Sequence, residues 1–149
     1  MPKNNKSIVK AASMERTLDG ALKALLTVSE KGNQAAKQRS RESKKLIAMN
    51  KRLSTKRSQL NKKKKAATVK LMKQHSSDNK DNLSAITKEL KGVMREIEKL
   101  KKTKANNAAE LSALKSCVKR ANAYLKCIER ADKALQRPAR SAKSRVKVA

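Results

Sequence analysis

The chain has 149 residues, enough for one ordinary domain, and its 40 Lys and Arg residues against 12 Asp and Glu residues give a formal net charge of +28. One Tyr with no Phe and no Trp excludes a bulky aromatic core, and three Gly with two Pro disfavour a fold with many strand turns. The remaining composition is rich in good helix formers, which predicts an elongated all-α protein. A positive charge this large attracts polyanions, so the expected partner classes are nucleic acid, an anionic membrane or an acidic protein.

The first half of the chain predicts two helices, over about 7–31 and 34–74, after a flexible N-terminus at 1–6. Lys31 followed by Gly32 is typical of a helix end, and Asn33 is able to cap the next helix. A continuous helix bent at Gly32 is the alternative. One heptad column of this half contains Leu18, Leu25, Leu46, Leu53, Leu60 and Ala67. The companion column contains Met14, Ala21, Val28, Ala35 and Met49, and continues as Lys56, Lys63 and Lys70.

Residues 37–73 carry half of the net charge, with 15 basic residues against Glu42 alone. Four adjacent lysines at 62–65 step by about 100° each and so encircle a helix. Leu60 and Ala67 continue the apolar column through this run, which predicts an ordered helix rather than a break. Lys63 falls on the companion column, where its aliphatic stem could pack while its ammonium group reaches water.

The segment 75–81 is polar and rich in Ser, Asn and Asp, which predicts a turn. A helix over about 82–136 follows, ended by Pro138. Its first heptad column contains Leu83, Leu90, Ile97, Leu111, Val118 and Leu125. Its second column contains Ile86, Val93, Leu100, Leu114, Ala121, Ile128 and Leu135. Lys104, Asn107 and Asp132 interrupt the columns.

Two heptad helices around a turn predict an antiparallel coiled-coil hairpin of two to three long helices, occupying 7–137, although the same heptads would also suit a homo-oligomer. One register for the hairpin pairs Leu60 with Leu100, Leu46 with Leu114 and Leu25 with Leu135, and it also brings Lys56 near Lys104. Residues 138–149 have four basic and no acidic residues and predict a flexible, disordered basic tail.

Catalytic and metal-binding motifs are missing from the sequence. His75 is the single histidine, and Cys117 and Cys127 lack ligand spacing, so we expect no enzyme, no cofactor, no metal and no small-molecule substrate. Both cysteines are expected to be reduced, with an intermolecular disulfide as the alternative. No apolar run approaches the roughly 18 to 20 residues that span a bilayer. The polar start also lacks the apolar core of a secretory signal, which predicts a cytoplasmic protein without a membrane span.

The predicted binding surface is therefore the basic one. Lysine outnumbers arginine 29 to 11, which favours point-charge contact with phosphates over base recognition. The predicted nucleic-acid contacts in the helical part are Lys44, Lys45, Lys51, Arg52, Lys56, Arg57, Lys62, Lys63, Lys64, Lys65, Lys70 and Lys73. The tail adds Arg140, Lys143, Arg145 and Lys147 as a second contact.

The tail "RPARSAKSRVKVA" and the lysine excess resemble, at the level of composition, the lysine-rich histone-H1-like nucleoid-associated proteins of bacteria. The electrostatics and this resemblance lead to the prediction of a small nucleoid protein that coats, bridges or compacts DNA largely independently of sequence. DNA is favoured over RNA as the partner. Two alternatives remain open: an RNA- or ribosome-associated helical protein, and a structural coiled coil that pairs with an acidic protein.

Overall fold

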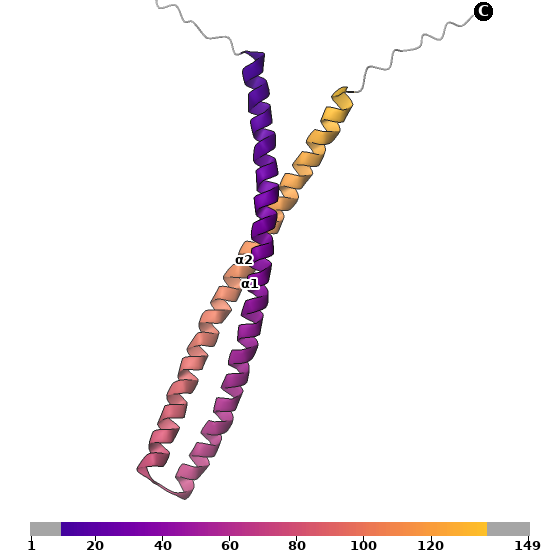
Figure 1. Cartoon of the computed structure of the whole chain (residues 1–149). Coiled ribbons are helices and arrows are strands. Elements are labelled where there is room, and N and C mark those ends of the chain that lie inside the picture. Colours follow the sequence, from indigo (N-terminus) through magenta and orange to yellow (C-terminus); the bar gives the residue numbers. More distant parts are fainter. Residues whose placement is uncertain (1–9, 137–149) are drawn as a thin grey trace, which may run out of the picture. The chain divides into compact units, whose positions relative to one another are not determined.

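The computed structural model describes residues 10–136, and these form two long helices with no strand among them (Figure 1). Helix α1 spans Ala11–Lys73 and helix α2 spans Ser77–Gln136. This confirms the all-α prediction. The expected flexible N-terminus at 1–6 and the expected basic tail at 138–149 lie outside the described residues, as do Arg140, Lys143, Arg145 and Lys147.

Gly32 does not end a helix, because α1 continues through it. The prediction of two helices at 7–31 and 34–74 is therefore wrong, and the helix is continuous, as the alternative expected. Gly32 instead faces Val118 of α2 so closely that an added Cβ would lie 2.5 Å from the Val118 Cγ2 atom. The glycine lets the two helices approach closely. The sequence alone does not distinguish a glycine with this role from one that ends a helix.

The connection between the helices is shorter than predicted and comprises residues 74–76. The Ser76 hydroxyl accepts a hydrogen bond from the Asn79 backbone N–H at 3.2 Å, and the Asn79 side chain donates to the Gln74 carbonyl at 2.8 Å. Ser76 thus caps α2, and Asp78 lies in the first turn, where its charge is favourable. The predicted turn at 75–81 is too long because most of its polar residues form the first turn of the helix.

The chain divides into two units, of which the first, called here the turn unit, is Ala35–Leu114. Within it the helices run antiparallel side by side from the connection (Figure 1). Leu60 of α1 is buried in a cluster with Leu90, Val93 and Ile97 of α2, and Leu53 and Ile86 pack against this cluster.

The short connection also changes the register of the turn unit. Leu60 packs in the cluster with Leu90, Val93 and Ile97, whereas the predicted register paired it with Leu100, and Lys56 meets Glu89 instead of lying beside Lys104. The predicted register is wrong because it assumed that α2 begins at 82, whereas Ser77 already belongs to the helix.

The column of α1 that accompanies the Leu25, Leu53 and Leu60 column was assigned one residue too early. The predicted companions Met14, Val28 and Met49 are 61%, 46% and 50% exposed. The less exposed positions are instead Leu22, Ser29, Ala36, Ser43, Asn50, Lys64 and Leu71. Four of these seven are polar, so a search for apolar residues does not detect them. Lys63 is accordingly exposed, and Lys64 is the half-buried member of the lysine run.

The second unit, called here the terminal unit, is described over residues 10–34 and 115–136. Val118 and Ala121 are its buried residues, and the Ser29 hydroxyl donates to Asn122 Oδ1 at 2.6 Å. Leu25 lies beside Ala121 and Tyr124, while Leu135 is 83% exposed. The predicted pairing of Leu25 with Leu135 is therefore wrong.

Candidate nucleic-acid interface

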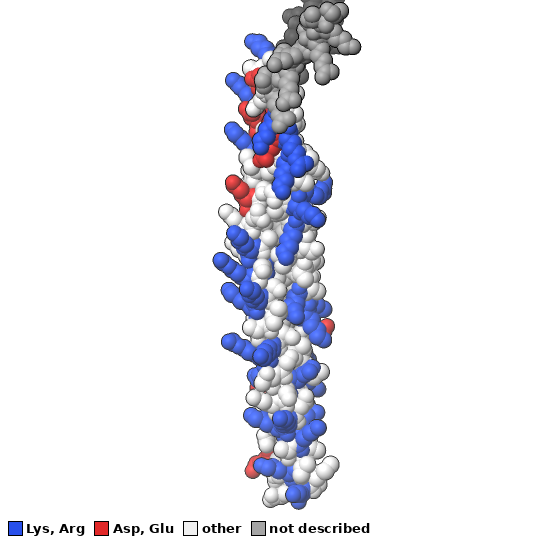
Figure 2. All heavy atoms as spheres, turned by 90° about the vertical axis from the view of Figure 1, so that its right-hand side faces the viewer, with Lys and Arg blue, Asp and Glu red and all other residues white. Residues whose placement is uncertain are grey.

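The turn unit holds most of the positive charge. It contains 23 Lys and Arg residues and 7 Asp and Glu residues. The described residues of the terminal unit contain 10 basic and 5 acidic residues. On the face drawn in Figure 2, Lys and Arg side chains recur over its whole length, whereas Asp and Glu side chains are few. A polyanion would therefore meet the highest charge density on the turn unit.

All twelve predicted contact residues of α1 belong to the turn unit, and eleven of them are exposed. The exception is Lys64, which is half-buried. It lies in an open groove together with Asn61, Lys65, Thr68, Val69 and Met72. The Thr68 hydroxyl donates to the Lys64 carbonyl at 2.9 Å, and this bond stays within the helix. The other three lysines of the run project from the helix without burial.

Apolar packing accounts for how a helix tolerates this lysine run. Leu60 and Ala67, which flank the run on the column facing α2, are both buried. Like charges at helical spacing destabilise a helix by a few tenths of a kcal/mol per pair, whereas burial of one large apolar side chain contributes about 1.5–3 kcal/mol. The repulsion is thus outweighed locally, and the ammonium groups remain available to a ligand.

Lys56 differs from its neighbours because it already has a partner. Its Nζ atom lies 2.9 Å from Glu89 Oε1, and both side chains are half exposed. The hydrogen bond to Glu89 and the charge of Glu89 raise the pKa of Lys56 above its ordinary value of 10.5. Lys56 is consequently less available to a phosphate than the exposed lysines of the run.

The sequence-based prediction missed a second row of basic side chains on α2. Its members are exposed and belong to the same unit: Lys80, Lys88, Lys91, Arg95, Lys99, Lys101, Lys102 and Lys104. Three of them, Lys80, Lys88 and Lys91, line a groove beside Leu71 of α1. Because the helices pair from the short connection onward, this row lies alongside the basic part of α1. A correct prediction of the register between the two helices would have revealed this second row.

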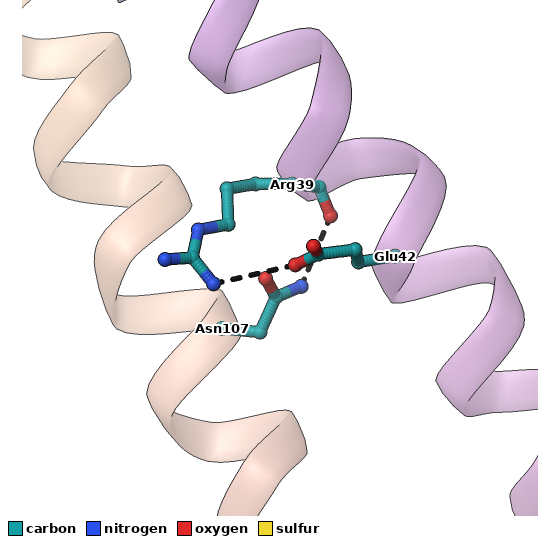
Figure 3. A network of polar contacts seen from close by, with 3 residues as sticks. All are labelled: Arg39, Glu42 and Asn107. Atoms are coloured by element: carbon teal, nitrogen blue, oxygen red, sulfur yellow. Dashed lines mark hydrogen bonds and ion pairs between the residues drawn. The ribbon is translucent and has the colours of Figure 1, made fainter.

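A polar contact interrupts the packing of the turn unit. Asn107 is 4% exposed, and its Nδ2 group donates to the Arg39 carbonyl oxygen at 3.0 Å. The Arg39 side chain is in turn paired with Glu42 at 3.3 Å, as Figure 3 shows. Asn107 Oδ1 has no hydrogen-bond partner among the described residues. Asn107 therefore ties α2 to the backbone of α1, while the Arg39–Glu42 pair stays within α1.

Other kinds of site find no support in the described part of the chain. Within residues 10–136, no group of three or more His, Cys, Asp or Glu residues is placed to hold a metal ion. Neither of the two helices is long and apolar enough to cross a membrane. Comparison of the chain with family models, with curated proteins and with solved structures gave no match.

Proposed function

We propose that this protein is a small nucleoid-associated, architectural DNA-binding protein that contacts duplex DNA largely independently of sequence. The observation that carries the proposal is the excess of 23 basic over 7 acidic residues in the turn unit, with eleven of the twelve predicted contacts on α1 exposed. The proposed role is binding rather than catalysis, and it places the protein in the cytoplasm on the nucleoid.

The proposed mechanism is counterion release. Duplex DNA carries one negative charge per roughly 1.7 Å, and each phosphate neutralised by a Lys or Arg releases condensed cations into solution. Ammonium groups in helical arrangement on both α1 and α2 supply such contacts without reading base edges. The predominance of lysine supports phosphate contact, since arginine is the residue that pairs with guanine in two-point recognition.

We also propose that α1 and α2 form an antiparallel coiled coil, so that the helix carrying the lysines is already folded before DNA binds. The support is the alternation of four- and three-residue steps among the less exposed positions of α1, such as Leu60, Lys64, Ala67 and Leu71. A helix ordered in advance loses less conformational entropy on binding than a disordered lysine-rich segment does.

The test is a salt titration of binding by the intact chain. Affinity is measured on two unrelated duplexes of equal length, by fluorescence anisotropy, between low and physiological salt. We expect the same affinity for both duplexes, and a decrease of about a thousandfold or more over this range for six to ten phosphate contacts. A strong preference for one duplex that survives at high salt would contradict the proposal.

The same assay separates the two alternative functions. A structured RNA bound much more tightly than either duplex at equal salt would favour an RNA- or ribosome-associated protein. Absence of measurable affinity for both nucleic acids at low salt would favour a structural role with an acidic protein partner. Either result would overturn DNA as the proposed ligand.

A further inference from the structure

In the terminal unit, α1 carries an apolar stripe that α2 covers only in part. Its members follow one another at steps of four, three, four and three residues: Met14, Leu18, Ala21, Leu25 and Val28. Leu25 is half-buried and the other four are exposed, with Leu18 67% exposed. Alternating steps of this kind are the pattern by which one helix packs against another. Within the described residues, α2 lies beside Leu25, whereas no helix covers Met14, Leu18 or Ala21.

The stripe continues into an open groove between the two helices of the terminal unit. Leu25 and Val28 of α1 line it together with Cys117, Ala121 and Tyr124 of α2. Tyr124 is 49% exposed, and its hydroxyl accepts a hydrogen bond from Arg120 Nη2 at 3.4 Å. The aromatic ring lies at the edge of an apolar groove between α1 and α2. Such a groove accepts a further helix.

The charge of α1 in this region bears on which partner can dock on the stripe. Residues 11–34 contain three basic and three acidic residues, so their net charge is zero, whereas the turn unit has a net charge of +16. Two copies of a chain with a net charge of +28 repel each other over most of their surface. They can approach most closely where the local charge cancels and apolar side chains are exposed. The stripe satisfies both conditions.

We propose that a second copy of this chain docks on the stripe, so that the terminal units of two chains form a symmetric dimer. In a two-fold arrangement the same stripe lies on both sides of the interface, and α1 of each chain enters the groove of its partner. This inference does not depend on DNA binding. If both hold, each dimer presents two basic turn units, and bivalent contact raises the effective affinity for a polyanion.

The test is sedimentation equilibrium of the intact chain without nucleic acid, at low and at high salt. We expect dimers that become tighter as salt rises, because salt screens the repulsion and strengthens apolar association. DNA binding has the opposite salt dependence. Failure of the dimer and failure of the proposed function are therefore distinguishable by independent measurements.

Two substitutions probe the stripe itself. Leu18→Glu and Val28→Glu are each expected to raise the dimer dissociation constant about tenfold or more, since they place a charge in an apolar interface. Met72→Glu is the matched control: Met72 is 73% exposed, on the same helix but in the turn unit, and this change is expected to leave the constant within about twofold. Helicity measured by circular dichroism shows that each variant remains folded.

The unmodified chain provides a second readout. Cys117 lines the groove and Cys127 does not, while both are exposed and free in the single chain. Dimer formation should slow labelling of Cys117 by a thiol reagent as protein concentration rises, with Cys127 less affected. A chain that stays monomeric at high salt and high concentration would overturn the proposal. A dimer that is indifferent to both glutamate substitutions, with Cys117 unprotected, would overturn it as well.

Discussion

The turn unit and the terminal unit use the same two helices in opposite ways. The turn unit has a buried cluster of Leu60, Leu90, Val93 and Ile97 under a surface with a net charge of +16. The terminal unit has Val118 and Ala121 as its buried residues, a lower charge, and apolar side chains such as Leu18 left exposed. The best packing thus occurs where the charge is greatest.

This difference has a physical reason. A surface of like charges destabilises any compact state, so it requires a compensating apolar core directly beneath it. In the described residues of the terminal unit the net charge is lower, with 10 basic and 5 acidic residues, so this requirement is weaker and apolar side chains can remain exposed. We propose ligand binding for the turn unit and self-association for the terminal unit, and each proposal can be tested separately.

Truncation of the core of the turn unit should have the largest effect on stability. Leu60→Ala is expected to lower the free energy of unfolding by about 3 kcal/mol, since Leu60 is 4% exposed and its loss leaves a cavity. Val69→Ala, at a 51% exposed position nine residues further along, should change it by no more than about 0.5 kcal/mol. Urea denaturation followed by circular dichroism measures both. Equal effects of the two changes would contradict the packing described for this unit.

The next largest effect on stability is expected in the terminal unit. Gly32→Ala should lower the free energy of unfolding by about 1–2 kcal/mol, because the new Cβ would meet Val118 Cγ2 at 2.5 Å. Gly20→Ala is the matched control on the same helix, since nothing lies within 4 Å of its Cβ position. The control should raise stability by about 0.5–1 kcal/mol through helix propensity alone. Stabilisation by both substitutions would mean that the helices do not approach closely at Gly32.

A smaller effect is expected at the polar interruption of the turn unit. Asn107→Leu should raise the free energy of unfolding by about 1 kcal/mol, because it removes a buried Oδ1 atom that has no partner among the described residues. The register would then be less strictly specified, as with other buried asparagines between paired helices. Asn106→Leu, at the exposed neighbouring position, should change stability by less than about 0.5 kcal/mol. A large loss of stability in the Asn107 variant alone would contradict this account.

The smallest effect concerns the one ion pair between α1 and α2 in the described residues. Glu89→Gln should raise the affinity for duplex DNA about threefold by freeing Lys56. Glu110→Gln removes the same charge from the turn unit and, within residues 10–136, breaks no ion pair, so its effect should be smaller. Because the pKa of Lys56 is raised above 10.5, the ammonium group remains charged at neutral pH, and on the alkaline side the pair is lost as pH rises through that raised value. Anisotropy at pH 7 compares the two variants.

Much of the fold could be predicted from the sequence because α2 keeps apolar residues on both heptad columns. Leu90, Val93, Ile97 and Leu100 were all placed on these columns and all are buried. The companion column of α1 was missed because Ser29, Ser43, Asn50 and Lys64 have no apolar signature. These side chains lie at the contact between the helices because of their positions along α1, not because of their residue types.

The candidate site could be predicted only in part. The basic segment of α1 is a property of composition and needs no structure. The second basic row on α2, including Lys88 and Lys91, depends on the register, and the register depends on where Ser76 caps the helix. Several residues of the polar segment could serve as the cap, so local sequence did not determine the choice.

The central claim is that DNA binds the turn unit rather than the terminal unit. The most direct test replaces four lysines with glutamine in each unit. One variant changes the lysines of the run, Lys62, Lys63, Lys64 and Lys65. The other changes four exposed lysines of the terminal unit, Lys115, Lys119, Lys126 and Lys133. Both variants lose the same net charge. The measured quantity is the slope of the logarithm of DNA affinity against the logarithm of salt concentration.

For the variant of the turn unit, we predict a slope that is shallower by about three to four, close to 0.9 per lost phosphate contact. For the variant of the terminal unit, we predict a change of less than about one. Equal changes in the two slopes would contradict the account, because DNA would then respond to total charge rather than to the basic surface of the turn unit.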